Sequence, residues 1–88
     1  AGRERPSHQV VAIVHASADG VRRGIGRWGH VEAVDETTCR VVMHVDNLAW
    51  PLMALGSVGA ELEVEGPPAL IETMADWAAR FGRATADA

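Results

Sequence analysis

The residues of this chain best suited to binding a ligand lie between positions 22 and 28. Arg22, Arg23 and Arg27 form a basic cluster, and Trp28 follows it directly. Arg23 and Arg27 are four residues apart, so they would share one face of a helix. Guanidinium groups bind phosphates through paired hydrogen bonds, and an indole offers a stacking surface. We predict that Arg23, Arg27 and Trp28 bind a phosphate-bearing or nucleotide-like ligand; the alternative is a solvated arginine face with Trp28 packed against the sheet edge as core.

Two histidines raise the question of a metal site. His15 and His44 lie near the ends of two expected strands, and imidazoles on a shared face can bind a metal ion. No carboxylate or thiol at ligand spacing completes a set, and His30 and Glu32 do not have the spacing of a zinc-binding helix. We therefore expect structural or surface histidines, with no metal and no other cofactor.

Cys39 and Ser17 are the residues to weigh as nucleophiles. A catalytic nucleophile needs a base within hydrogen-bond reach and a group that orients this base, and no motif here supplies them. Ser17 lacks a Gly-x-Ser-x-Gly setting. The loop that follows the first expected strand contains Asp19, which would repel the phosphate bound by acyl-phosphate hydrolases of a similar fold. We do not expect an enzyme.

Composition excludes several classes of function. A net charge of −4 over 88 residues argues against unaided binding to duplex DNA, where phosphate neutralisation dominates the affinity. The expected third strand lacks the aromatic residues with which similar sheets bind single-stranded RNA. Apolar runs such as Val10–Val14 are far shorter than the ~20 residues of a membrane span. A single cysteine is typical of a reducing compartment, so we expect a cytoplasmic protein.

One small domain must position all of these residues. We expect it to span residues 8–83, with residues 1–7 as the end of a linker and residues 84–88 as a frayed tail. The expected elements are a strand over 8–16, a helix capped by Ser17, strands over 29–35 and 38–46, a helix from Ala49 or Trp50 to Gly56 or Gly59, a strand over 61–65 and a helix from Pro67–Pro68 to Gly82. This order predicts an α+β, ferredoxin-like β-α-β-β-α-β sheet with an added C-terminal helix.

The last helix has the most regular apolar pattern. Its apolar residues recur at helical spacing, at Leu70, Met74, Trp77 and Phe81. We expect this stripe to pack on the sheet, and we assign Trp50, Trp77 and Phe81 to the core.

The central strands predict a second apolar surface. Helices can cover one face of the sheet, and Val11, Ile13 and Val42, or their neighbours of opposite parity, would then lie on the other. Such a surface on a monomer usually meets a partner, so we expect self-association or docking of another domain.

The segment 46–70 carries a resemblance to a known family. It reads Asp46-Asn47-Leu48-Ala49-Trp50, then Leu55-Gly56, Glu61-Leu62-Glu63-Val64, Pro67 and Leu70. This order resembles the end of the C-terminal extension (WCX) domain of bacterial WYL-domain, helix-turn-helix transcriptional regulators, and the resemblance covers most of the chain.

The resemblance implies a regulatory domain within a longer polypeptide. The first methionine is Met43, which agrees with a chain cut from something larger. The WYL and helix-turn-helix domains would lie upstream, and DNA would be contacted only through the helix-turn-helix. The resemblance also implies a homodimer, and an effector such as a nucleotide or nucleic acid sensed mainly by the WYL domain. The alternative is a small-molecule-sensing module of the amino-acid-binding type, attached to a metabolic enzyme; Gly20 is late in the loop for that role.

Overall fold

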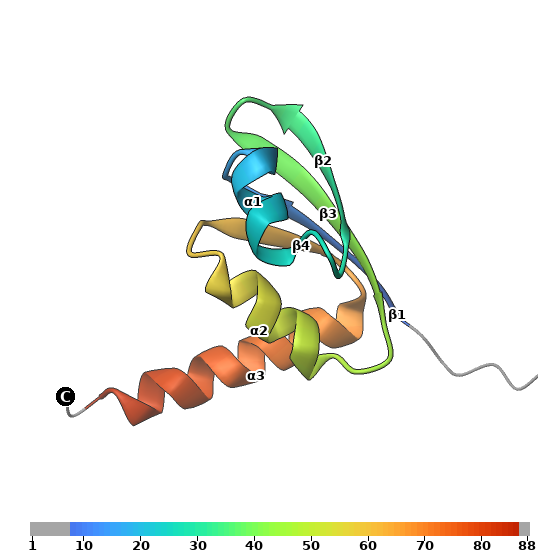
Figure 1. The fold of residues 1–88 in the computed structure, drawn as a ribbon. Coiled ribbons are helices and arrows are strands. Elements are labelled where there is room, and N and C mark those ends of the chain that lie inside the picture. The colour runs from blue at the N-terminus through green and yellow to red at the C-terminus, as the bar shows by residue number, and fades with distance from the viewer. Residues whose placement is uncertain (1–7, 87–88) are drawn as a thin grey trace, which may run out of the picture.

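The computed structural model describes residues 8–86 as a mixed α+β domain with one antiparallel sheet and three helices (Figure 1). The elements are β1 (His8–Val14), α1 (Ala18–Ile25), β2 (His30–Asp35), β3 (Thr38–Val45), α2 (Ala49–Ser57), β4 (Leu62–Gly66) and α3 (Pro68–Ala84). Their types and order are those expected from the sequence. The expected linker end at residues 1–7, and the last part of the expected tail at 87–88, lie outside the described residues.

The strand β1 lies in the interior of the sheet, whose order is β2-β3-β1-β4. It pairs antiparallel with β3 on one side and with β4 on the other. Val10, Ala12 and Val14 are 0% exposed, so alternate residues of β1 form the centre of the core. The strand expected over residues 8–16 is therefore a central strand, as suits a segment rich in β-branched residues.

The strands β2 and β3 form a hairpin at one side of the sheet. Its turn is held by the Asp35 carboxylate, which accepts hydrogen bonds from the backbone N–H and the hydroxyl of Thr37 at 2.8 and 3.2 Å. Asx turns of this kind explain why Asp is frequent at such positions. The hydrogen bond from the Thr37 backbone is also the main reason why the pKa of Asp35 lies below its usual value.

The helices α1 and α2 cover one face of the sheet (Figure 1). The Ser17 hydroxyl caps α1 by accepting a hydrogen bond from the Gly20 N–H at 3.2 Å, and Val21 and Ile25 are buried beneath the helix. At the start of α2, the side-chain oxygen of Asn47 accepts a hydrogen bond from the Ala49 N–H at 2.7 Å. The capping residue predicted for α1 is confirmed.

The helix α3 differs from its prediction in length and in packing. It continues past Gly82 to Ala84, and Leu70 is its buried residue. The helix lies against β4 and α2 rather than across the sheet, and its C-terminal half extends beyond the rest of the domain (Figure 1). Met74 and Trp77 are partly buried, whereas Phe81 is 60% exposed. The assignment of Phe81 to the core was wrong, because the sheet ends before the helix does.

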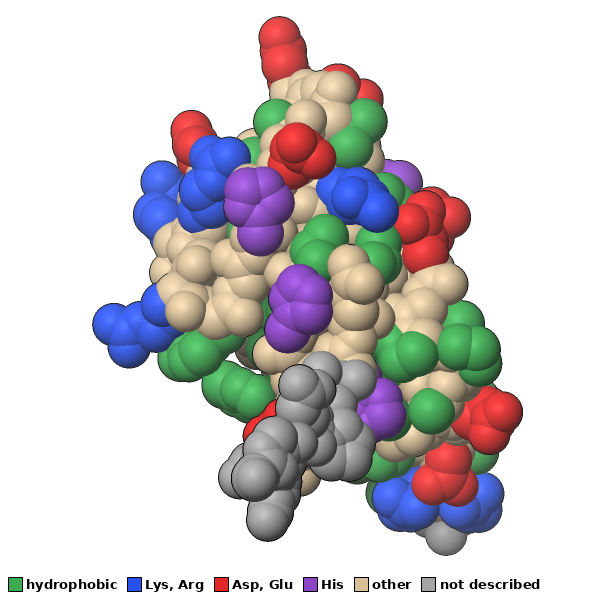
Figure 2. Space-filling view, turned by 90° about the vertical axis from the view of Figure 1, so that its right-hand side faces the viewer, with side chains coloured by type: hydrophobic (Ala, Val, Ile, Leu, Met, Phe, Trp, Pro, Cys, Tyr) green, Lys and Arg blue, Asp and Glu red, His purple; other side chains and the backbone are tan. Residues whose placement is uncertain are grey.

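The other face of the sheet, which we call the open face, has no helix over it among the described residues (Figure 1). Val11, Ile13 and Val42 lie on it and are partly exposed, because Val10, Ala12 and Val41 point into the core. Figure 2 views the molecule from this side and shows apolar side chains between acidic, arginine and histidine side chains. The predicted second apolar surface is thus present. It is formed by Val11, Ile13 and Val42 and not by their neighbours, and Val11 lies opposite Val42.

No helix within residues 8–86 has the length and apolar character needed to cross a membrane.

The packing of α3 leads to a test of what holds it. Leu70→Ala should lower the free energy of unfolding by about 2–5 kcal/mol, because it opens a cavity at a fully buried position. Phe81→Ala, on the same helix, should lower it by less than about 1 kcal/mol because its ring is largely solvated. Urea denaturation measures both values. Equal losses for the two variants would show that the end of α3 is packed as firmly as its beginning.

Candidate functional site

The predicted ligand-binding residues are brought together only in part. The helix α1 ends at Ile25, so Arg27 and Trp28 lie in the turn that follows it while Arg23 stays on the helix. The Arg27 guanidinium carbon stands 5.4 Å from the centroid of the Trp28 ring, a cation–π contact. Arg23 is exposed and forms no ion pair with any residue of the described range. The pair of Arg27 and Trp28 is therefore the part of the predicted site that has a defined geometry.

The third arginine of the cluster, Arg22, has a structural role. Its guanidinium donates to the Asp19 carboxylate at 3.1 Å and to the Val31 carbonyl at 2.9 Å. These bonds tie α1 to the neighbouring β2. Arg22 is thus held within the domain, whereas Arg23 and Arg27 are the cations of this cluster that lack a carboxylate partner within residues 8–86.

A second tryptophan, Trp50, completes the aromatic surface. The ring centroids of Trp28 and Trp50 are 5.1 Å apart with an interplanar angle of 74°, an edge-to-face pair. Trp28 is 44% exposed and Trp50 is 38% exposed, so the assignment of Trp50 to the core was wrong. The physical reason lies in α2, where Pro51, Leu52 and the residues one turn later face the core. Trp50 lies at the margin of that face, one turn before Ala54.

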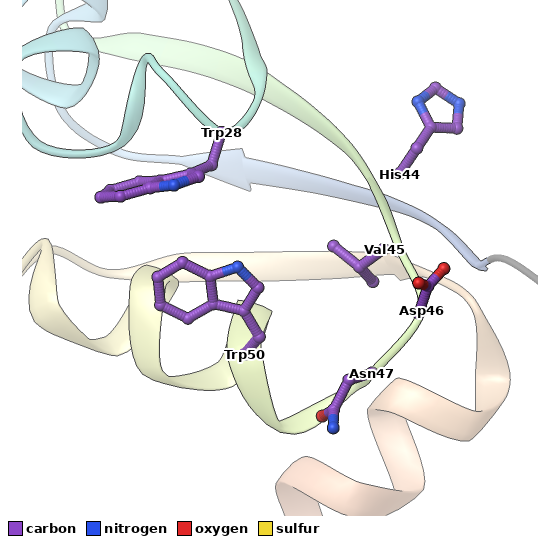
Figure 3. A pocket seen from close by; sticks show the side chains of 6 residues that line it. All are labelled: Trp28, His44, Val45, Asp46, Asn47 and Trp50. Carbon is purple, nitrogen blue, oxygen red and sulfur yellow. The ribbon is translucent and has the colours of Figure 1, made fainter.

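A shallow hollow of about 380 Å³ adjoins the tryptophan pair. It is lined by Trp28, His44, Val45, Asp46, Asn47 and Trp50 (Figure 3). Figure 3 shows the Val45 side chain on the side of the two indoles, while the His44 imidazole points away from them. This alternation follows from the extended backbone of β3, whose even-numbered residues face the other side of the sheet.

The approach of Trp28 to the sheet depends on Gly29. A Cβ atom at Gly29 would lie 2.9 Å from the Met43 Cγ and 3.1 Å from the Val42 carbonyl oxygen. A larger residue would push the turn after α1 away from β3, and the indole of Trp28 with it. Glycine here sets the depth at which the tryptophan pair sits.

Sequence reasoning missed Trp50, Val45 and Asn47 as neighbours of Trp28. No pattern within α2 sets Trp50 apart, because nearly every residue of this helix is apolar. No local pattern places Val45 beside Trp28, because the contact joins segments that are far apart in the sequence.

The two histidines that raised the metal question lie far apart along the sheet. Each lies near the C-terminal end of its strand, and β1 and β3 run antiparallel, so His15 and His44 lie toward opposite ends of the sheet. The Nε2 atom of His15 is 2.8 Å from a carboxylate oxygen of Glu63 on the neighbouring β4. Within residues 8–86, no group of three or more His, Cys, Asp or Glu side chains is arranged to hold a metal ion.

Cys39 lies in the core rather than at a site. Its side chain is 0% exposed. Desolvation raises the pKa of the Cys39 thiol above its usual value, and the charge of Arg22 opposes that shift. A thiol with a raised pKa and no access to solvent is a poor nucleophile.

The raised pKa of Cys39 predicts a loss of stability at alkaline pH. The folded chain keeps the thiol proton at a pH where the unfolded chain has released it, so stability is full below the unfolded pKa of about 8.5 and falls as the pH rises toward the folded value. The chain contains no lysine or tyrosine, so no other side chain titrates in this range. The urea midpoint should fall more between about pH 8 and pH 10 in the wild type than in Cys39→Ala. Identical pH profiles would contradict it.

Comparison with known proteins assigns the chain to a family. Residues 6–82 match the WCX domain, which covers both central strands, the tryptophan pair and nearly all of α3. No curated protein matches the chain. No solved structure matches it either. Because the match spans most of the sequence, the chain belongs to the WCX domain family.

Proposed function

We propose that the chain is the C-terminal regulatory domain of a bacterial WYL-type transcriptional regulator. Its role would be to pair two copies of the regulator and to couple effector sensing upstream to DNA binding by a helix-turn-helix domain. The observation that carries this proposal is the match of residues 6–82 to the WCX domain. The regulator would act in the cytoplasm, where the DNA is.

The sheet supports a ferredoxin-like assignment of the fold. The unit β1-α1-β2 leaves room between its two strands, and β3 lies there; the unit β3-α2-β4 in turn encloses β1. Two strand-helix-strand units interleaved in this way form the split arrangement of ferredoxin-like domains. Domains of this plan present one sheet face without helices, which is the face through which we propose the domain meets its partner.

The chemistry of the open face supports pairing with a second copy. Val11 and Val42 are cross-strand neighbours at its centre, and Ile13 extends the apolar surface toward Glu63 on β4. Arg40 lies on the same face, paired in register with both Ile13 and Glu32. A surface with an apolar centre and charges of both signs at its margin can match a copy of itself across a two-fold axis.

The charge of the domain supports a division of labour in which another domain reads the DNA. A protein that neutralises phosphates needs a concentration of cations, whereas this chain carries a net charge of −4. The proposed contribution of this domain to operator binding is therefore geometric. Pairing would set the distance between two DNA-reading units that bind a palindromic site.

The alternative, a module of the amino-acid-binding type, finds less support. Such modules bind effectors through the loop after the first strand. Here the Ser17 hydroxyl in that loop caps α1, and Gly20 lies inside the helix rather than in the loop. The polar group that a ligand would use is already engaged.

Reading the coding sequence upstream of this domain tests the proposal most directly. A helix-turn-helix followed by a WYL domain is expected, and a catalytic domain would overturn the proposal. The 88-residue chain alone should show no sequence-specific retardation of an operator fragment at physiological salt, whereas the complete regulator should retard it.

The proposed pairing predicts the effect of a charge placed at the centre of the open face. Val42→Lys should shift the chain from dimer to monomer in sedimentation equilibrium, because burying an unpaired ammonium group at an interface is unfavourable. Val34→Lys is the matched control, since Val34 is 59% exposed near the tip of the β2–β3 hairpin. It should leave association unchanged. A wild-type chain that stays monomeric at high concentration would contradict the pairing.

A further inference from the structure

The tryptophan pair has free surface and free donors that its packing role does not use. The two indoles bridge the junction between the turn after α1 and the first turn of α2, and this contact alone would explain the pair as structural. However, both rings stay more than a third exposed. Neither indole N–H donates a hydrogen bond to another residue within 8–86, although indoles in well-packed interfaces usually find a partner.

Arg23 and Arg27, which precede Trp28 in the sequence, also lack carboxylate partners among the described residues. Arg27 lies over the Trp28 ring, and Arg23 is exposed in the last turn of α1; neither pairs with a carboxylate among the described residues. In a chain whose net charge is −4, a guanidinium group that lies over Trp28 and has no carboxylate partner favours an anion near this indole.

The hollow adds an apolar surface next to the indole N–H groups. Val45 and the two indoles face one another across it, and its volume of about 380 Å³ lies at the small end of the range for ligand sites. Asp46 also lines the hollow, and Figure 3 shows its carboxylate on the far side of the backbone from the tryptophans. It interacts with another group already. An anion would therefore lie at the tryptophan end, away from Asp46.

We infer that the hollow between Trp28, Trp50 and Val45 is a binding site for a small aromatic carboxylate. The flat ring of the ligand lies against the open indole surface and the Val45 methyl groups. Its carboxylate accepts hydrogen bonds from the indole N–H groups and forms an ion pair with Arg27. Arg27 loses no ion pair by turning toward the ligand. The inference concerns this domain alone and does not depend on the domains proposed to lie upstream.

Two probes with the same ring and opposite charges test the inference on the 88-residue chain. Indole-3-acetate carries a carboxylate and tryptamine carries an ammonium group. The chain has three tryptophans, so its indole N–H groups give three NMR signals, and Trp77 on α3 serves as an internal control. Indole-3-acetate should shift the signals of Trp28 and Trp50 but not that of Trp77, with a dissociation constant on the order of 1 mM for a ligand of this size.

Substitutions assign the contribution of the charge. Arg27→Ala should weaken indole-3-acetate binding about fivefold to tenfold, through loss of a charge-assisted hydrogen bond. Arg40→Ala, which removes an arginine from the open face, should leave the affinity unchanged. The signals of the unliganded Arg27→Ala variant show whether the tryptophan pair is retained. Trp28→Phe keeps a ring but removes a donor, so it should also weaken binding.

Three results would overturn the inference. The first is equal or tighter binding of tryptamine, which would make the hollow a cation site. The second is a shift of all three indole signals together, which would indicate unspecific stacking. The third is no shift of the Trp28 and Trp50 signals at concentrations of indole-3-acetate about tenfold above the expected constant.

Discussion

The pairing of β1 with β3 is the interaction on which the rest of this domain depends. The two strands are in register along the whole length of β1, from His8 opposite Val45 to Val14 opposite Cys39. Each of the three inward residues of β1 is 0% exposed, and Cys39 and Val41 are equally buried beside them. A shift of the register by one residue would bring Val11 and Ile13 into the core and expose Val10 and Val14. Both faces of the domain therefore take their character from this one pairing.

The remaining elements divide according to how they meet that central pair. The helix α1 is fixed by buried side chains and by Arg22, and α2 by a compact buried face. The helix α3 packs only against the edge of the layer formed by α1 and α2. Leu70 is therefore fully buried, whereas the residues farther along the helix are not. Stability is thus concentrated near β1 and β3, while exposed aromatic groups collect where elements end.

Local chemistry was sufficient to predict every element of the fold, and it failed where packing partners lie far apart in the sequence. The Ser17 cap, the start of α2 near Ala49 and the strand expected over 38–46 each depend on neighbours within a few residues, and each gave the observed structure. Helical spacing placed Phe81 in line with Leu70, but spacing cannot tell where the covered surface stops. The same limit applies to the site, because Arg27 and Trp28 are adjacent in sequence whereas Trp50 arrives through the path of β3 and α2.

The helix α3 is packed most tightly at Leu70 and less tightly farther along, so its C-terminal end can move as the end of a lever does. From Leu70 to Ala84 the helix runs about 20 Å, at 1.5 Å per residue. A tilt of about 10° at the anchored end would therefore move the far end by about 4 Å. Met74 and Trp77 pack against the core between Leu70 and Phe81, so they would have to shift with the helix. Such a tilt would be large enough to make or break a contact at Phe81.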